Sequence, residues 1–267
     1  MRNYGEFTVK TAEGRWTATK PWLATCTDTG FAGWDLAIPD TVRAARWIEQ
    51  FRGQVAGDSM PALTILRLPN DHTAGASAAF PTPRAFVADN DLALGRVIEA
   101  LTHSPYWKTT VVFVLEDDAQ DGPDHVDSHR SPLLVISAYN RPGIRRRFAN
   151  TTDVIATIDR ILGLGALSTF DRFGAPLDWA FAATADTSPY TALRPQVPMG
   201  EVNPEAHEAR HVVAASRPDP RRPGGRGALQ SHPVVVDQGR DPSLPTPRGP
   251  DGTPRPALSA DRLSTPP

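Results

Sequence analysis

The sequence contains a single cysteine, Cys26, among its 267 residues. One thiol excludes any intramolecular disulfide, so cysteine usage gives no indication of the redox compartment. An isolated cysteine is most often a small packed or loop residue, and we interpret Cys26 in this way rather than as a catalytic thiol.

Long apolar runs are also missing. No stretch approaches the roughly 18 consecutive apolar residues that a membrane-spanning helix needs. The first residues, Met1 to Phe7, do not contain the apolar segment of a secretory signal peptide. The sequence as written therefore predicts no membrane span and a cytoplasmic chain, and it leaves the true localisation open.

A strong excess of one charge is absent as well, since the formal net charge is −2. This balance argues against a protein that binds nucleic acid through a broad basic surface. The arginines near the C-terminus (Arg217, Arg221, Arg222 and Arg226) are interleaved with Asp and Pro, which dilutes their charge. We therefore predict no nucleic-acid partner.

Proline is abundant, with 27 residues, and much of it follows residue 185. From residue 217 to the end the sequence is rich in Pro, Arg, Gly, Asp and Ser, and only Val234 to Val236 form an apolar run. Such a segment buries too little apolar surface to offset its ordering entropy. We predict a folded region over residues 1–198 and a disordered tail over residues 199–267.

Within the folded region, apolar strand-like and helix-like segments alternate. Short β-prone runs predict strands over residues 62–68, 109–115 and 133–137. Helical spacing of apolar residues predicts helices over 40–51, 89–103 and 151–162, with Asp40 and either Asn90 or Asp91 as N-caps and Gly163 as a C-cap. A loop over 73–84 separates the first strand from the second helix. This order is typical of an α/β sheet with helical crossovers, in which ligands collect at the carboxyl ends of the strands.

Three consecutive acids, Glu116, Asp117 and Asp118, directly follow the strand predicted over 109–115. Adjacent carboxylates repel one another, and a bound divalent cation would supply the counter-charge. Oxygen ligands suit Mg²⁺, Mn²⁺ or Ca²⁺, and added histidines extend the range to Zn²⁺ or Fe. The alternative is that the run is only a solvated loop with a helix-cap signal.

Histidines lie close to this run and at the end of another strand. His125 and His129 follow the acids in a stretch bounded by Gly-Pro and Ser-Pro, which indicates a loop. Asp71 and His72 follow the strand predicted over 62–68. Each pair by itself could be an ordinary turn or surface pair. Because all three clusters converge on one edge of the predicted sheet, we favour a single site.

The same residues carry a family resemblance. The motifs are Leu-Pro-Asn-Asp-His-Thr (68–73), Pro-Thr-Pro-Arg (81–84), Ala-Asp-Asn-Asp (88–91) and the acidic and histidine-rich run over 116–130. In this order they resemble bacterial phosphoesterases of the phospholipase C and acid phosphatase branch of the alkaline phosphatase superfamily. The resemblance extends from about Arg2 to Pro198.

This resemblance implies an α/β fold, with an alkaline-phosphatase-like sheet sandwiched by helices. It also implies a hydrolase of phosphate esters that depends on a divalent metal, which we expect to be Zn, Mn, Ca or Mg. The expected substrates are a small phosphate ester or a phospholipid head group. By position, the implied metal ligands are Asp71, Asp117, Asp118 and His129, and the implied substrate contacts are His72 and His125.

One part of the family pattern is missing from the sequence. The family's Ser or Thr nucleophile follows an acidic residue and Asn at the end of an earlier strand, and no such motif is found here. Thr25, Thr27 and Thr29 are in the wrong region, relative to the later motifs, to be that nucleophile. We therefore expect an incomplete, C-terminal part of the domain, with no catalytic nucleophile and an exposed sheet edge prone to self-association. Full-length relatives are expected to be exported. The alternative is a non-catalytic metal- or phosphate-binding remnant, or the product of a pseudogene.

Overall fold

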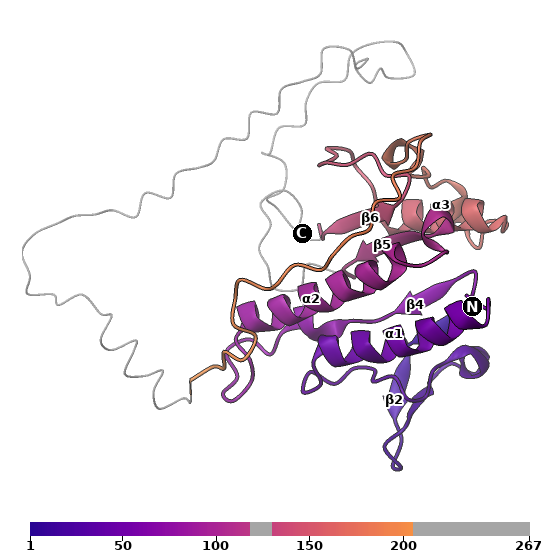
Figure 1. The fold of residues 1–267 in the computed structure, drawn as a ribbon. Helices are drawn as coiled ribbons and strands as arrows, with labels where there is room; N and C mark the ends of the chain where they lie inside the picture. Colours follow the sequence, from indigo (N-terminus) through magenta and orange to yellow (C-terminus); the bar gives the residue numbers. More distant parts are fainter. Residues whose placement is uncertain (118–129, 205–267) are drawn as a thin grey trace, which may run out of the picture. The chain divides into compact units, whose positions relative to one another are not determined.

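A computed structural model describes residues 1–117 and 130–204 as a mixture of helices and small sheets (Figure 1). The strands of the described residues form two-stranded sheets. The pairs are β1 (Arg2–Tyr4) with β4 (Thr64–Leu66), β2 (Thr8–Lys10) with β3 (Trp16–Ala18), and β5 (Val111–Leu115) with β6 (Leu133–Ser137). The first pair is parallel and the other two are antiparallel.

Four α-helices accompany these strands in the described part of the chain. They are α1 (Asp40–Ala56), α2 (Pro83–Thr102), α3 (Thr151–Leu162) and the short α4 (Thr169–Arg172). Single 3₁₀ turns complete the described elements: η1 (Pro21–Cys26), η2 (Pro69–His72), η3 (Trp107–Thr109) and η4 (Asp178–Ala180). None of the described helices is both long and apolar enough to cross a membrane.

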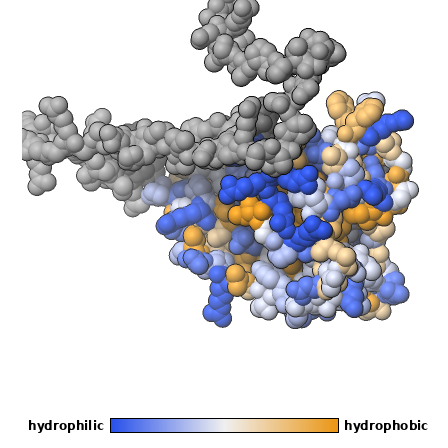
Figure 2. All heavy atoms as spheres, turned by 90° about the horizontal axis from the view of Figure 1, so that it is seen from above, coloured by the Kyte–Doolittle hydropathy of each residue, from blue (hydrophilic) through white to orange (hydrophobic). Residues whose placement is uncertain are grey.

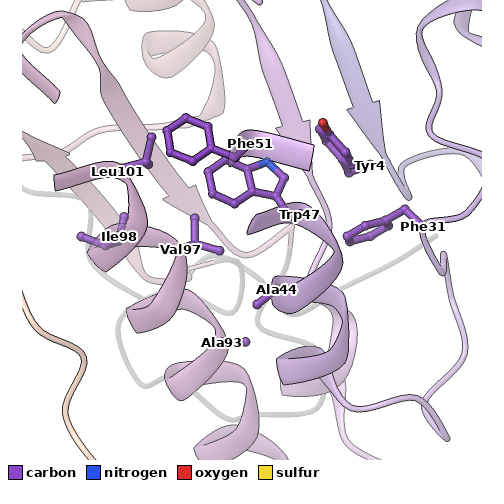
Figure 3. Packing of buried hydrophobic residues seen from close by; sticks show 9 residues of the cluster. All are labelled: Tyr4, Phe31, Ala44, Trp47, Phe51, Ala93, Val97, Ile98 and Leu101. Carbon is purple, nitrogen blue, oxygen red and sulfur yellow. The ribbon is translucent and has the colours of Figure 1, made fainter. Parts of the chain in front are cut away.

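The larger core lies between α1 and α2 and the strands beneath them. Trp47 and Phe51 of α1 stack with ring centroids 4.8 Å apart and meet Val97 and Leu101 of α2 (Figure 3). Partly buried residues of two sheets, Leu66, Val112 and Ile136, pack against this cluster together with Leu68, which follows β4. The helix pair therefore covers both the β1–β4 sheet and the β5–β6 sheet.

A second core forms on the opposite face of the β5–β6 sheet. Buried Val154 of α3 and Leu177 pack there with Phe113 and Val135. Residues 112 and 113 enter different cores because successive side chains of a strand point to opposite faces. The β5–β6 pair is thus packed on both sides, which agrees with the α/β class expected from the sequence.

Several elements were predicted correctly. The strand over 133–137 and the helix over 151–162 have the expected bounds, and Gly163 ends that helix in the left-handed conformation, with φ 66°. Asn150 and Asp153 form a reciprocal capping box at its start. The strand expected over 62–68 is present but shorter, at Thr64–Leu66, and the strand expected over 109–115 begins two residues later, because Trp107–Thr109 form a 3₁₀ turn.

Other expectations were wrong. The second helix begins at Pro83 rather than near residue 89, because Thr82 accepts a hydrogen bond from the amide of Ala85 and proline suits a first helical turn. Asn90 and Asp91 are therefore helix-interior residues and not caps. Asp40 does not cap α1 either, since its side chain is turned inward and fully buried. The pairing of β5 with β6 is antiparallel, so it involves no helical crossover.

Contacts between chain segments continue past residue 198. Glu201 and Asn203 exchange backbone hydrogen bonds with the loop before α2, through the amide of Thr82 and the carbonyl of Phe80. The side-chain amide of Asn203, which is 8% exposed, donates to the carbonyls of Gly75, Ser77 and Pro81. The described fold therefore extends at least to Pro204, and the disordered tail predicted from 199 lies, from residue 205 on, outside the described residues.

The capping box of α3 can be tested by mutation. Replacing Asn150 by Ala removes the acceptor for the amide of Asp153, and we expect unfolding to become easier by about 1 kcal/mol in urea titrations. Thr151→Ala, an exposed change one residue later, should leave the unfolding free energy within about 0.5 kcal/mol of the original. An Asn150→Ala protein as stable as the Thr151→Ala control would contradict the capping role.

Candidate functional site

Two strands deliver the predicted acids. After β4, residues Leu68 and Pro69 lead into the 3₁₀ turn η2, which carries Asp71 and His72. Glu116 and Asp117 follow β5 directly. Asp71 is half-buried and Asp117 is exposed. The charges of Asp71, Glu116 and Asp117 act on one another, so acids from separate strand ends are brought together as the sequence predicted.

This gathering of carboxylates changes their acidity. Burial raises the pKa of Asp71, and the charge of Asp117 raises it further, although backbone amides at Asp71 and His72 oppose the rise. Burial also raises the pKa of Glu116, and both Asp71 and Asp117 add to the effect. A cation placed among the three would remove this repulsion.

His72 is held at the same turn by its neighbours. Its Nδ1 lies 2.9 Å from the carbonyl oxygen of Thr73, and its ring meets the ring of Trp34 edge-on with centroids 4.7 Å apart. The guanidinium group of Arg67 lies over the ring of Trp34, with its carbon 5.0 Å from the ring centre. If Nδ1 donates to the carbonyl, Nε2 carries the lone pair that a metal or a phosphate proton would use.

The backbone after His72 is strained. Thr73 has φ 60° and ψ 171°, a conformation that non-glycine residues rarely adopt. Its amide donates to the carbonyl of Asn70 at 3.0 Å, and its hydroxyl accepts from the amide of Gly75 at 3.1 Å. The bonds from Asn203 to Gly75, Ser77 and Pro81 fix the loop that follows, so the turn that carries Asp71 and His72 is held from both ends.

A buried polar network lies directly beneath this turn. Asp40, which is fully buried, accepts the amide of Asn70 at 2.8 Å and the side-chain amide of Asn90 at 3.0 Å. Asp89 of α2 accepts the amide of Asp40 at 2.5 Å and the hydroxyl of Thr41 at 2.7 Å. The first turn of α1 is therefore capped by a carboxylate of another helix, which also suits the positive end of the helix dipole.

Arg43 holds this network from within, since it is only 1% exposed. It donates to the carboxylate of Asp40 at 3.1 Å. Its remaining donors reach backbone carbonyls at 2.5 to 3.0 Å, from Ala32, Gly33, Asp35 and Ile38. A buried guanidinium is tolerated here because all of its donor groups have acceptors.

The pKa values of the charged residues in the network are shifted as well. Burial raises the pKa of Asp40 to about 6, even though Asn70, Asn90 and Arg43 favour its ionised form. Burial also lowers the pKa of Arg43, and Asp40 is the main opposing influence. The pair is therefore costly to bury, and the hydrogen bonds that Asp40 accepts from Arg43, Asn70 and Asn90 offset part of that cost.

The described residues include only part of the predicted metal site. Asp71 and Asp117 have the right donor chemistry and act on each other, so they fit a divalent cation. Within residues 1–117 and 130–204, no group of three or more His, Cys, Asp or Glu is arranged to hold a metal ion. The predicted ligands Asp118 and His129, and the predicted substrate contact His125, lie outside the described residues.

A comparison with protein families decides the affiliation of this region. The model of the phosphoesterase family matches residues 34–165, close to half of the chain. Over this stretch the chain matches the phosphoesterase family, and we call residues 34–165 the phosphoesterase segment. The phosphoesterase segment contains Asp71, His72, Glu116 and Asp117, and also the side chains of the buried network, which are Asp40, Arg43, Asn70, Asp89 and Asn90. No curated protein matched the chain.

Sequence reasoning missed the residues that support the turn of the phosphoesterase segment. Trp34 and Arg43 were not among the predicted site residues. A signal for the network was present, because Asp89 and Asn90 are polar residues inside a helix whose neighbours Leu92 and Ala93 are buried. Polar residues on a buried helix face generally have partners.

The raised pKa of Asp40 predicts how stability depends on pH. Its folded pKa of about 6 lies above its ordinary value of 3.8, so its contribution is complete below pH 3.8 and is lost as the pH rises through 6. Relative to Asp40→Asn, the unchanged protein should lose about 3 kcal/mol of unfolding free energy over this window. Urea titrations at a series of pH values would measure the difference.

The matched control is Asp91→Asn, an exposed acid on the same helix as Asp89. Because Asp40 is still present in this variant, its unfolding free energy should fall over the same pH window as that of the unchanged protein. A wild-type minus Asp40→Asn difference that stays flat between pH 4 and 7 would show that Asp40 does not titrate in this range.

Proposed function

We propose that the phosphoesterase segment provides the metal-binding part of a site that hydrolyses phosphate esters. The observation that carries the proposal is the meeting of acids that follow β4 and β5: burial raises the pKa of Asp71 and Glu116, and the neighbouring carboxylates add to the rise. Proteins rarely place like charges together without a counter-charge, and functional sites are where such arrangements concentrate. A divalent cation is the counter-charge that oxygen ligands select.

Each predicted residue has a role in this proposal. Asp71 and Asp117 hold the cation, with Asp118 and His129 as further ligands, and His72 and His125 contact the substrate. When bound, the cation would polarise the phosphoryl oxygens and stabilise the charge that develops during displacement. The chain's own contribution is to fix the ligands, and the network around Arg43 does this by holding Asn70, the residue before Asp71.

The substrate follows from the same chemistry. A cation held by carboxylates binds a phosphoryl group through its oxygens, whatever the alcohol attached to it. We propose a phosphate mono- or diester, such as a small phosphate ester or a phospholipid head group. In this proposal His72, exposed beside Trp34, would contact the phosphoryl group through the lone pair of Nε2.

We also propose that the hydroxyl nucleophile is supplied by a segment outside the present sequence. In the described residues β4 pairs only with β1 and β5 only with β6, although both pairs pack under the same helices. Each of the two strands therefore has an edge whose backbone groups could pair with a further strand. A strand placed there would end beside Asp71 and Asp117. The same edges would favour self-association of the chain.

Metal binding is the first test. Calorimetric titration of the purified chain with Mn²⁺ or Zn²⁺ should show saturable binding that Asp71→Asn and Asp117→Asn each weaken by at least about tenfold. Asp91→Asn serves as the matched control, because it removes one exposed carboxylate away from the strand ends. Affinity that is the same in all three variants would refute the assignment of the site.

Catalysis is the second test, and it distinguishes a phosphoesterase site from a non-catalytic metal- or phosphate-binding remnant. Loss of a nucleophile costs on the order of 10⁶ in rate in a well-studied hydrolase. The chain alone should therefore show negligible turnover of p-nitrophenyl phosphate with Mn²⁺, Ca²⁺ or Zn²⁺, while still binding metal. Robust turnover that Asp117→Ala abolishes would show that the chain contains its own nucleophile. Absence of both binding and turnover would favour the non-catalytic remnant.

A further inference from the structure

The segment after β6 combines positive charge with exposed apolar side chains. Between Arg130 and Thr152 the sequence contains five arginines and no acid: Arg130, Arg141, Arg145, Arg146 and Arg147. Residues 141–148 (Arg-Pro-Gly-Ile-Arg-Arg-Arg-Phe) are all exposed, and we call them the basic loop. This density of charge stands out in a chain whose formal net charge is −2.

The base of the basic loop is fixed. The amide of Arg141 donates to the carbonyl of Ala180 at 2.9 Å, and Asn140 pairs with Phe181 in an isolated bridge. At the other end, Arg147 lies over the ring of Trp179, with its guanidinium carbon 5.6 Å from the ring centre. The loop is therefore held at both ends by the segment around η4, and its tip projects.

The projecting tip carries side chains that the fold does not use. Ile144 is 88% exposed and Phe148 is 84% exposed, in contrast to the cores on either face of the β5–β6 sheet. Gly143, with φ 109°, makes the turn just before Ile144. Within residues 1–117 and 130–204, no carboxylate forms an ion pair with Arg141 or with any arginine of 145–147.

A third exposed apolar side chain, Phe173, lies near the start of α3. Phe173 is 82% exposed, and the following Gly174 lies so close to the first turn of α3 that a Cβ there would be 2.8 Å from the carbonyl oxygen of Thr152. Phe148 precedes that turn by only a few residues. Exposed apolar side chains thus accompany the arginines of this segment. Figure 2 shows that hydrophobic and hydrophilic residues are intermixed on the visible face of the molecule.

We propose that the basic loop is a membrane-docking surface for anionic phospholipid bilayers. Arginines would bind lipid phosphates, and Ile144 and Phe148 would insert between the head groups, which is the division of labour in interfacial anchors. Because every residue of the loop is exposed, its side chains can enter a lipid surface together, whereas a folded protein partner would need a pocket opposite Ile144 and Phe148. The proposal does not depend on the phosphoesterase site, since Ser137 pairs with Val111 and the loop leaves the sheet at the end of β5 remote from Asp117.

Co-sedimentation of the full chain with vesicles tests this surface. Binding should be strong to vesicles of phosphatidylcholine mixed with phosphatidylglycerol and weak to pure phosphatidylcholine. Each arginine near an anionic surface contributes about 1 kcal/mol, a factor of about five, so Arg145→Gln/Arg146→Gln should weaken binding about 30-fold. Ile144→Ser/Phe148→Ser should also lower binding, by at least about tenfold. Equal binding to neutral and anionic vesicles would overturn the proposal.

Matched controls come from exposed residues elsewhere. Arg52→Gln/Arg96→Gln removes the same charge, and Trp22→Ser removes an aromatic that is 67% exposed, so both variants should bind vesicles like the original. The arginines at 217, 221, 222 and 226 form a second basic set, and their replacement by Gln should leave most of the binding intact. Binding lost in that variant and kept in the loop variants would overturn the proposal. The proposal would also be overturned if the unchanged chain self-associates and Ile144→Ser/Phe148→Ser makes it monomeric while its vesicle binding stays unchanged.

Discussion

The buried pair of Arg43 and Asp40 is the constraint on which the candidate site depends. Asp40 begins α1, fixes the amide of Asn70 and is itself fixed by Asp89 and Asn90 of α2. The position of the turn after β4 is therefore set by the packing of two helices rather than by the strand alone. Burying an ion pair stabilises a fold little, so the gain here is placement: Asp71 stands next to a residue that cannot move without breaking the network.

That placement explains why the acids of two strands meet. β4 pairs with β1 and β5 with β6, and no ladder among the described residues joins β4 to β5. The two sheets are held next to each other by apolar packing under the same helices, through Leu66, Leu68, Val112 and Ile136. Apolar packing is non-directional and fixes a strand end only loosely. The hydrogen bonds from Asp40 and Asn90 supply the direction that packing does not.

The sequence predicted what depends on local patterns. The bounds of β6 and α3 follow from an apolar run and from Asn150 and Gly163 at the helix ends, so near neighbours decide them. The convergence of Asp71 with Asp117 was also predictable, because strand ends in α/β folds share an edge. The start of α2 was missed because Thr82 and Pro83 look like loop residues until the helix that they begin is known.

The remainder was hidden because its partners are far apart in the sequence. Asp89 caps a helix that begins 49 residues earlier, and Asn203 fixes a loop more than 120 residues before it. No periodicity reports such pairs. A polar residue on an apolar helix face indicates that a partner exists, but only the fold identifies it. The turn with Asp71 and His72 depends on both long-range pairs, so its chemistry could be predicted from the sequence while its rigidity could not. Rigidity matters for the proposed metal site, because a cation held by carboxylates from separate strands requires those strand ends to keep their spacing before the cation binds.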